Sequence, residues 1–102
     1  MSICYLNGNY VELSKASISP LDRGFLFGDS VYEVLAAYEK NLFRLDDHME
    51  RLKKNLQSLS INIALENSEI KSILQKVCEK NPEENQIIYL QISRGAEAIR
   101  NH

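Results

Sequence analysis

Apolar residues in the first half of the chain occur in short runs separated by turn-forming residues, a pattern typical of β-hairpins. Residues 3–6 and 10–13 are two such runs, and Asn7-Gly8-Asn9 between them favours the left-handed backbone of a tight turn. Residues 31–38 and 42–45 are a second pair, joined by residues 39–41. The first half therefore predicts two hairpins, with a helix over 31–38 as the alternative.

Side chains alternate between the two faces of a strand. The predicted strand over 31–38 divides in this way into two sets: Val31, Glu33, Leu35 and Ala37 on one face, and Tyr32, Val34, Ala36 and Tyr38 on the other.

The second half of the chain has helical spacing. Apolar residues recur every three or four positions over 46–59 and again over 67–80, which predicts two amphipathic helices. Asp46 and Asp47 are suitable N-cap residues for the first, and Pro82 ends the second. Residues 86–93 predict a well-buried strand. The apolar positions of the two helices are Met49, Leu52, Leu56, Leu59, Ile70, Ile73, Leu74 and Val77.

This order of elements predicts an α+β fold. We expect one domain over residues 1–102, with a largely antiparallel sheet of hairpins and two helices packed on one face of it.

Composition excludes several classes of protein. The formal net charge is −2 with scattered charges, which gives no basic footprint for nucleic acid. No apolar run approaches the ~20 residues of a membrane span. Cys4 and Cys78 lack metal-ligand spacing, so we expect idle or buried thiols. We therefore expect a cytoplasmic protein without nucleic-acid or membrane partners.

The segment 19–33, SPLDRGFLFGDSVYE, mixes glycine, proline and charge with aromatic residues. It predicts a shaped loop packed against the protein body, the kind of segment that often carries binding sites. We expect Asp22 and Arg23 to pair with each other or to brace this loop.

A few residues have chemistry suited to a binding site. Arg51 lies three residues after His48 on the first helix, and an arginine there can hold a phosphate with two hydrogen bonds. An exposed arginine paired with Asp47 or Glu50 is the alternative. The Tyr32 hydroxyl can bond a carboxylate or a cofactor oxygen, or be satisfied within a core.

The last residues of the chain hold a second candidate pair. Arg100 and His102 point the same way in an extended segment and can converge on a substrate carboxylate. A frayed terminus is the alternative.

In this order, the segment 19–33, the HMERL helix around Arg51 and the Arg94-Gly95 strand end resemble the N-terminal domain of the class IV pyridoxal-phosphate (PLP) aminotransferases. The D-amino acid aminotransferase branch is the nearest. The resemblance spans nearly the whole chain. Ser30 stands where the family commonly has glycine, and the segment before Arg100 is one residue longer than in the relatives.

The resemblance implies an activity: transfer of amino groups between D-amino acids such as D-alanine and 2-oxo acids, with PLP as cofactor. It assigns the cofactor phosphate to Arg51 and the substrate carboxylate to Tyr32, Arg100 and His102. The last two are implied to reach across a homodimer interface.

The resemblance also implies a longer protein. The Schiff-base lysine belongs to the second half of these enzymes, so we expect a C-terminal domain beyond this chain and no activity from residues 1–102 alone. Branched-chain aminotransferase and aminodeoxychorismate lyase are alternatives on the same fold. A non-catalytic oligomerisation or binding module is an alternative of another class.

Overall fold

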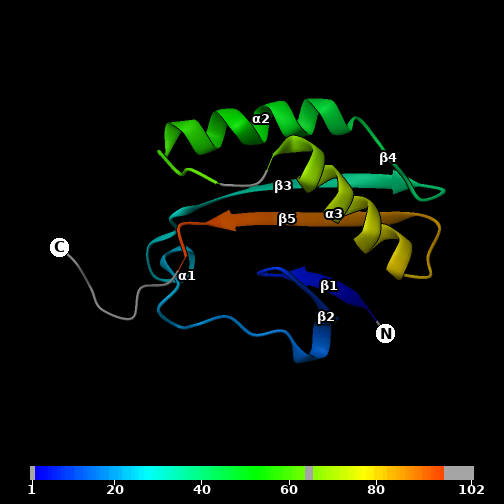
Figure 1. Ribbon diagram of the computed structural model, residues 1–102, viewed down its shortest axis with the longest axis horizontal. Helices are drawn as coiled ribbons and strands as arrows, with labels where there is room; N and C mark the ends of the chain where they lie inside the picture. Colours follow the sequence, from blue (N-terminus) through cyan, green and yellow to red (C-terminus); the bar gives the residue numbers. More distant parts are fainter. Residues whose placement is uncertain (1, 64–65, 96–102) are drawn as a thin grey trace.

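The computed structural model describes residues 2–63 and 66–95. The chain forms, in order, β1 (Ile3–Leu6), β2 (Asn9–Glu12), a 3-10 turn (Leu13–Lys15), α1 (Arg23–Phe27), β3 (Ser30–Tyr38), β4 (Asn41–Leu42), α2 (Leu45–Ser58), α3 (Asn67–Lys80) and β5 (Gln86–Ser93) (Figure 1). The predicted α+β class is confirmed.

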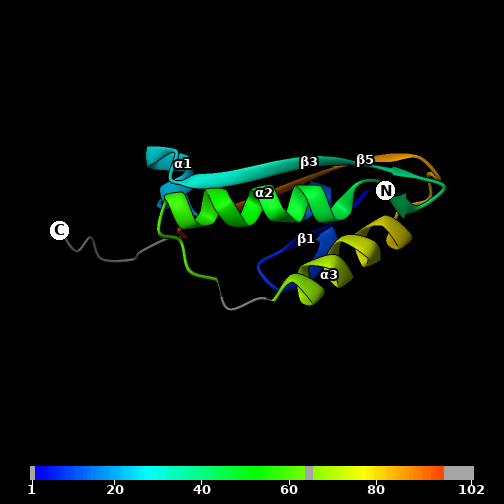
Figure 2. The same cartoon turned by 90° about the horizontal axis from the view of Figure 1, so that it is seen from above.

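All strand pairings are antiparallel and fall into two sheets. β1 and β2 form a hairpin through Asn7 and Gly8, both with positive φ. The larger sheet has the order β4-β3-β5, and β3 pairs with β5 from Ser30↔Ser93 to Ala37↔Gln86. Figure 2 shows α2 and α3 on the same side of this sheet, as the sequence predicts.

The core lies between the helices and one face of β3. The inward set of β3 is buried, and it packs with α3, with β5 and with three residues of the predicted α2 stripe, Met49, Leu52 and Leu56. The fourth predicted position, Leu59, is 39% exposed and follows the helix. The buried apolar residues are Val31, Leu35, Ala37, Met49, Leu52, Leu56, Ile61, Ile70, Leu74, Cys78 and Ile88. The division of β3 into two faces is therefore confirmed, and Cys78 is a buried thiol as expected.

Several details of the predicted elements are wrong. β4 spans two residues instead of 42–45, and α2 begins after Arg44, which adopts a left-handed N-cap, so that Asp46 and Asp47 lie in the first turn. β5 is not well buried, because its outward side chains Ile87 and Tyr89 are 79% and 60% exposed.

The segment 19–33 is also more regular and less packed than predicted. It contains the five-residue helix α1, capped by the Asp22 carboxylate, which accepts a hydrogen bond from Gly24 N at 2.8 Å. Its residues Phe25, Leu26 and Phe27 are exposed, not packed against the body. Asp22 and Arg23 brace the loop and do not pair with each other, since Arg23 bonds Asp29.

Two polar residues connect elements that are distant in sequence. The Asn81 side chain accepts from Ile3 N and donates to Ile3 O, both at 2.9 Å, so it acts as a strand partner for β1 at the end of α3. Arg94 donates to the Asp29 carboxylate ahead of β3 and to the carbonyl oxygens of Leu59 and Ser60 at the end of α2. A cation at a helix C-terminus is favourable because of the helix dipole.

Position 24 has no room for a side chain, so glycine is required there. A Cβ built there lies 2.8 Å from the Ser93 Cβ and 3.0 Å from the Asp22 carboxylate. Gly24→Ala is therefore expected to lower the free energy of unfolding by about 1–3 kcal/mol through overpacking. Urea denaturation measures this value. Gly28→Asn is the control, because Gly28 has φ +64° with open space around it and asparagine tolerates that backbone; equal losses in both variants would contradict the packing argument.

Asp29 should make stability depend on pH. The hydrogen bond from Arg94 lowers the pKa of Asp29 below its usual 3.8; burial opposes this shift and Arg23 adds to it. A carboxylate with a lowered folded pKa stabilises the fold at higher pH and loses that contribution as the pH falls through the folded pKa. We expect thermal stability to drop below about pH 3.8, and Asp29→Asn to be less stable at pH 7 with a flatter acid limb. An unchanged acid limb would rule out this role.

Candidate functional site

Arg51 is held by a buried carboxylate. It lies on the exposed flank of α2, beside the stripe that packs on β3, and Glu33 is the charged member of the inward set of β3. Arg51 Nε donates to Glu33 Oε2 at 2.8 Å and Arg51 Nη2 donates to Oε1 at 2.7 Å. The Glu33 side chain is 4% exposed and that of Arg51 is 63% exposed. The carboxylate of this pair is therefore buried, and its guanidinium side is exposed.

His48 completes this cluster. Its Nδ1 lies 2.7 Å from Glu33 Oε1, one turn of α2 before Arg51. The hydrogen bonds from Arg51 lower the pKa of Glu33; burial opposes the shift and His48 adds to it. Glu33 is thus an anion in the native state, compensated by the two groups that face it from α2. The same bonds raise the pKa of Arg51, which stays a cation.

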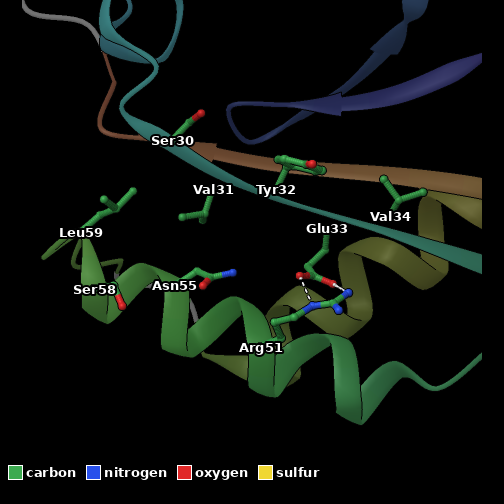
Figure 3. A pocket seen from close by; sticks show the side chains of 9 residues that line it. All are labelled: Ser30, Val31, Tyr32, Glu33, Val34, Arg51, Asn55, Ser58 and Leu59. Carbon is green, nitrogen blue, oxygen red and sulfur yellow. Dashed lines mark hydrogen bonds and ion pairs between the residues drawn. The ribbon is translucent and has the colours of Figure 1, made fainter.

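An open hollow of about 600 Å³ lies beside this cluster (Figure 3). It is lined by Ser30, Val31, Tyr32, Glu33, Val34, Arg51, Asn55, Ser58 and Leu59. Five consecutive β3 residues contribute although their side chains alternate, so the hollow runs along the edge of the strand. β4 pairs only with Ala37 and Tyr38, and this edge has no partner strand in the described part of the chain. The walls are thus the β3 edge and the C-terminal half of α2.

Tyr32 borders the same hollow from the other face of β3. Figure 3 shows Glu33 directed toward α2 and Tyr32 directed away from it. The Tyr32 side chain belongs to the outward set and is 61% exposed. Its ring stacks on Tyr89 of β5 with centroids 5.7 Å apart and an interplanar angle of 13°. The hydroxyl is therefore presented on the open face of the sheet, on the side of β3 away from α2.

The structure thus brings together two of the four predicted site residues. Arg51 and Tyr32 line one hollow, and Arg51 pairs with neither Asp47 nor Glu50, since Asp47 pairs with Arg44. Arg100 and His102 lie outside the described residues. Sequence reasoning missed Glu33, although a signal was present: it is the only charged residue in the inward set of the predicted strand, and a buried charge needs a partner.

The arrangement is suited to binding an anion. Two of the three guanidinium nitrogens bond Glu33, and among the described residues no hydrogen bond from Nη1 is found. That nitrogen and the amide of Asn55, which lines the same hollow, are donors suited to a phosphate. The Ser58 hydroxyl also lines the hollow, but it donates to the Lys54 carbonyl oxygen at 3.1 Å. Across residues 2–63 and 66–95, no group of three or more His, Cys, Asp or Glu side chains is placed to hold a metal ion. In the same residues, no helix is long and apolar enough to cross a bilayer.

Comparison with known proteins finds curated relatives that match most or all of this chain. The chain is 38% identical over 96 residues to a D-alanine aminotransferase of Bacillus licheniformis, covering 94% of this chain and 34% of the relative. It is 34% identical over its full length to a D-alanine aminotransferase of Staphylococcus aureus (strain MSSA476), covering 36% of that protein. The chain therefore spans about a third of the length of the curated relatives it matches.

A solved structure shares the fold. A branched-chain amino acid aminotransferase from T.th., complexed with N-(5'-phosphopyridoxyl)-L-glutamate, superposes with a TM-score of 0.87 at 26% identity. The match covers 97% of this chain and 35% of that one.

A family model described as amino-transferase class IV matches residues 30–101, which include β3, α2 and both walls of the hollow. The chain belongs to the class IV aminotransferases.

Proposed function

We propose that this chain is the N-terminal part of a PLP-dependent transaminase that exchanges amino groups between D-amino acids such as D-alanine and 2-oxo acids. The observation that carries the proposal is Arg51, which is held by two hydrogen bonds to Glu33 and lines the same hollow as Tyr32. The relatives named D-alanine aminotransferase support the substrate class.

The cofactor PLP fits the residues present. Arg51 would hold its phosphate, with the amide of Asn55 as a further donor along the same wall. PLP supplies the electron sink for amino-group transfer, whereas protein groups orient it and select the substrate. The reactive lysine is expected in a C-terminal domain beyond residue 102.

Tyr32 would bind the substrate carboxylate. Its hydroxyl lies on the open face of β3 while Arg51 lies at the helix side of the same edge, so the two would bind different anionic groups of one complex. Arg100 and His102 are proposed to complete this carboxylate site from the partner subunit of a homodimer. We likewise propose the cytoplasmic location that the sequence predicts.

Branched-chain aminotransferase is the second candidate, because a solved enzyme of that name superposes on this chain with a TM-score of 0.87. The two curated relatives described above, at 38% and 34% identity, bear the name D-alanine aminotransferase, and they favour the first candidate.

The two candidates differ in substrate. The full-length protein with PLP and 2-oxoglutarate is expected to form pyruvate from D-alanine much faster than it deaminates L-leucine, measured with a coupled lactate dehydrogenase assay for pyruvate and by chromatography for leucine. Residues 1–102 alone serve as the control and are expected to be inactive. Faster turnover of L-leucine would favour the branched-chain enzyme, and activity in neither reaction would favour the non-catalytic module.

The role of Arg51 is tested by cofactor affinity. Arg51→Ala in the full-length protein is expected to weaken PLP binding at least about tenfold, because a charge-assisted pair with the phosphate is lost. Equilibrium titration of the apoenzyme followed by absorbance measures this. Arg44→Ala is a matched control, because Arg44 is the N-cap of the same helix and its side chain is 64% exposed, against 63% for Arg51. Unchanged affinity in Arg51→Ala would remove Arg51 from the phosphate site.

A further inference from the structure

We propose that Glu33, braced by His48, is a positioning residue that fixes the direction in which Arg51 presents its free nitrogen to the cofactor phosphate. This inference rests on the proposed function and adds to it a residue that does not itself touch the cofactor.

The geometry of the pair defines the orientation of the guanidinium. Two parallel bonds, from Nε to Oε2 at 2.8 Å and from Nη2 to Oε1 at 2.7 Å, fix both the position and the plane of the group. With its side chain 63% exposed, Arg51 has little packing to hold it otherwise. Without Glu33, a long side chain would have to lose its rotamer freedom when it binds the phosphate, which weakens binding.

Glu33 is itself held rigidly. Its side chain is 4% exposed, and its strand β3 is paired with β5 along the whole segment from Ser30 to Ala37. His48 contacts Oε1 at 2.7 Å, so the carboxylate cannot rotate without breaking a second contact. The orientation of Arg51 is thereby fixed relative to β3, which forms one wall of the hollow.

The negative charge of Glu33 acts against its positioning role. Glu33 is an anion near a proposed phosphate site, and its charge alone repels a phosphate. If repulsion dominates, Glu33→Gln tightens PLP binding; if positioning dominates, the same change weakens it. Glutamine keeps the size of the side chain, but its amide NH2 faces a guanidinium N–H and cannot accept a hydrogen bond from it. The sign of the change therefore separates the two effects.

The experiment compares PLP with pyridoxal, which lacks the phosphate, on the full-length apoenzyme. Glu33→Gln is expected to weaken PLP binding about threefold to tenfold and to leave pyridoxal binding nearly unchanged. Glu50→Gln is the matched control, since Glu50 is exposed on the same helix next to Arg51. In the Arg51→Ala background, Glu33→Gln is expected to have no further effect on PLP affinity. A purely structural lesion would weaken both ligands in both backgrounds.

The outcomes are distinguishable. Tighter PLP binding in Glu33→Gln, or an equal loss for PLP and pyridoxal, overturns the positioning role. If Arg51→Ala itself leaves the PLP-to-pyridoxal preference unchanged, the proposed phosphate site fails instead. If thermal melting shows that Glu33→Gln does not fold, His48→Ala decides: a smaller loss confined to PLP supports the proposal, and a loss shared by pyridoxal overturns it.

Discussion

The site depends on one constraint, the strict alternation of side chains along β3. Pairing with β5 over eight residues fixes the register of this strand, and packing of Val31, Leu35 and Ala37 under the helices fixes which face is inside. Glu33 must then point toward α2, and Tyr32 must point to the open face. Slipping the strand by one residue would exchange these two environments and bury a tyrosine where the carboxylate is now. The same hydrophobic contacts that form the core therefore place both polar groups of the hollow.

A buried carboxylate in that position also links the site to the stability of the fold. Removing an ion from water is unfavourable unless partners compensate it, and Glu33 has its compensation in Arg51 and His48 of α2. The helix is consequently held against the sheet by apolar contacts on one flank and by this charged cluster on the other. Arg51 is thus both a structural partner of Glu33 and the exposed cation of the hollow. Losing either group would disturb the other, which is why affinity and stability have to be measured together.

Much of the fold could be predicted from the sequence, because the spacing of apolar residues and the residue types that form turns are local properties. The hairpin at Asn7-Gly8, the α2 stripe from Met49 to Leu56 and the division of β3 into two faces all follow from spacing, and each is confirmed. The burial of β5 could not be predicted in this way. Ile87 and Tyr89 have strong strand propensity, but propensity does not say which faces of a sheet are covered, and here only one is. The Glu33–Arg51 pair joins residues 18 positions apart, so neither residue's local pattern reveals it.

Residues 22–29, which include α1, contribute to the architecture of the site and not to its chemistry. None of the residues 22–29 lines the hollow. Asp22 caps α1, Gly24 allows α1 to approach β5, and Asp29 binds Arg94, whose guanidinium also reaches the Leu59 and Ser60 carbonyls. These bonds connect the start of β3 to the end of α2, and those two segments are the walls of the hollow. Toward the other end of the hollow, β4 and the Glu33–Arg51 pair join β3 to α2. The distance between the two walls is therefore fixed at two points. The segment around α1 therefore sets the width of the hollow, although none of its residues 22–29 lines it.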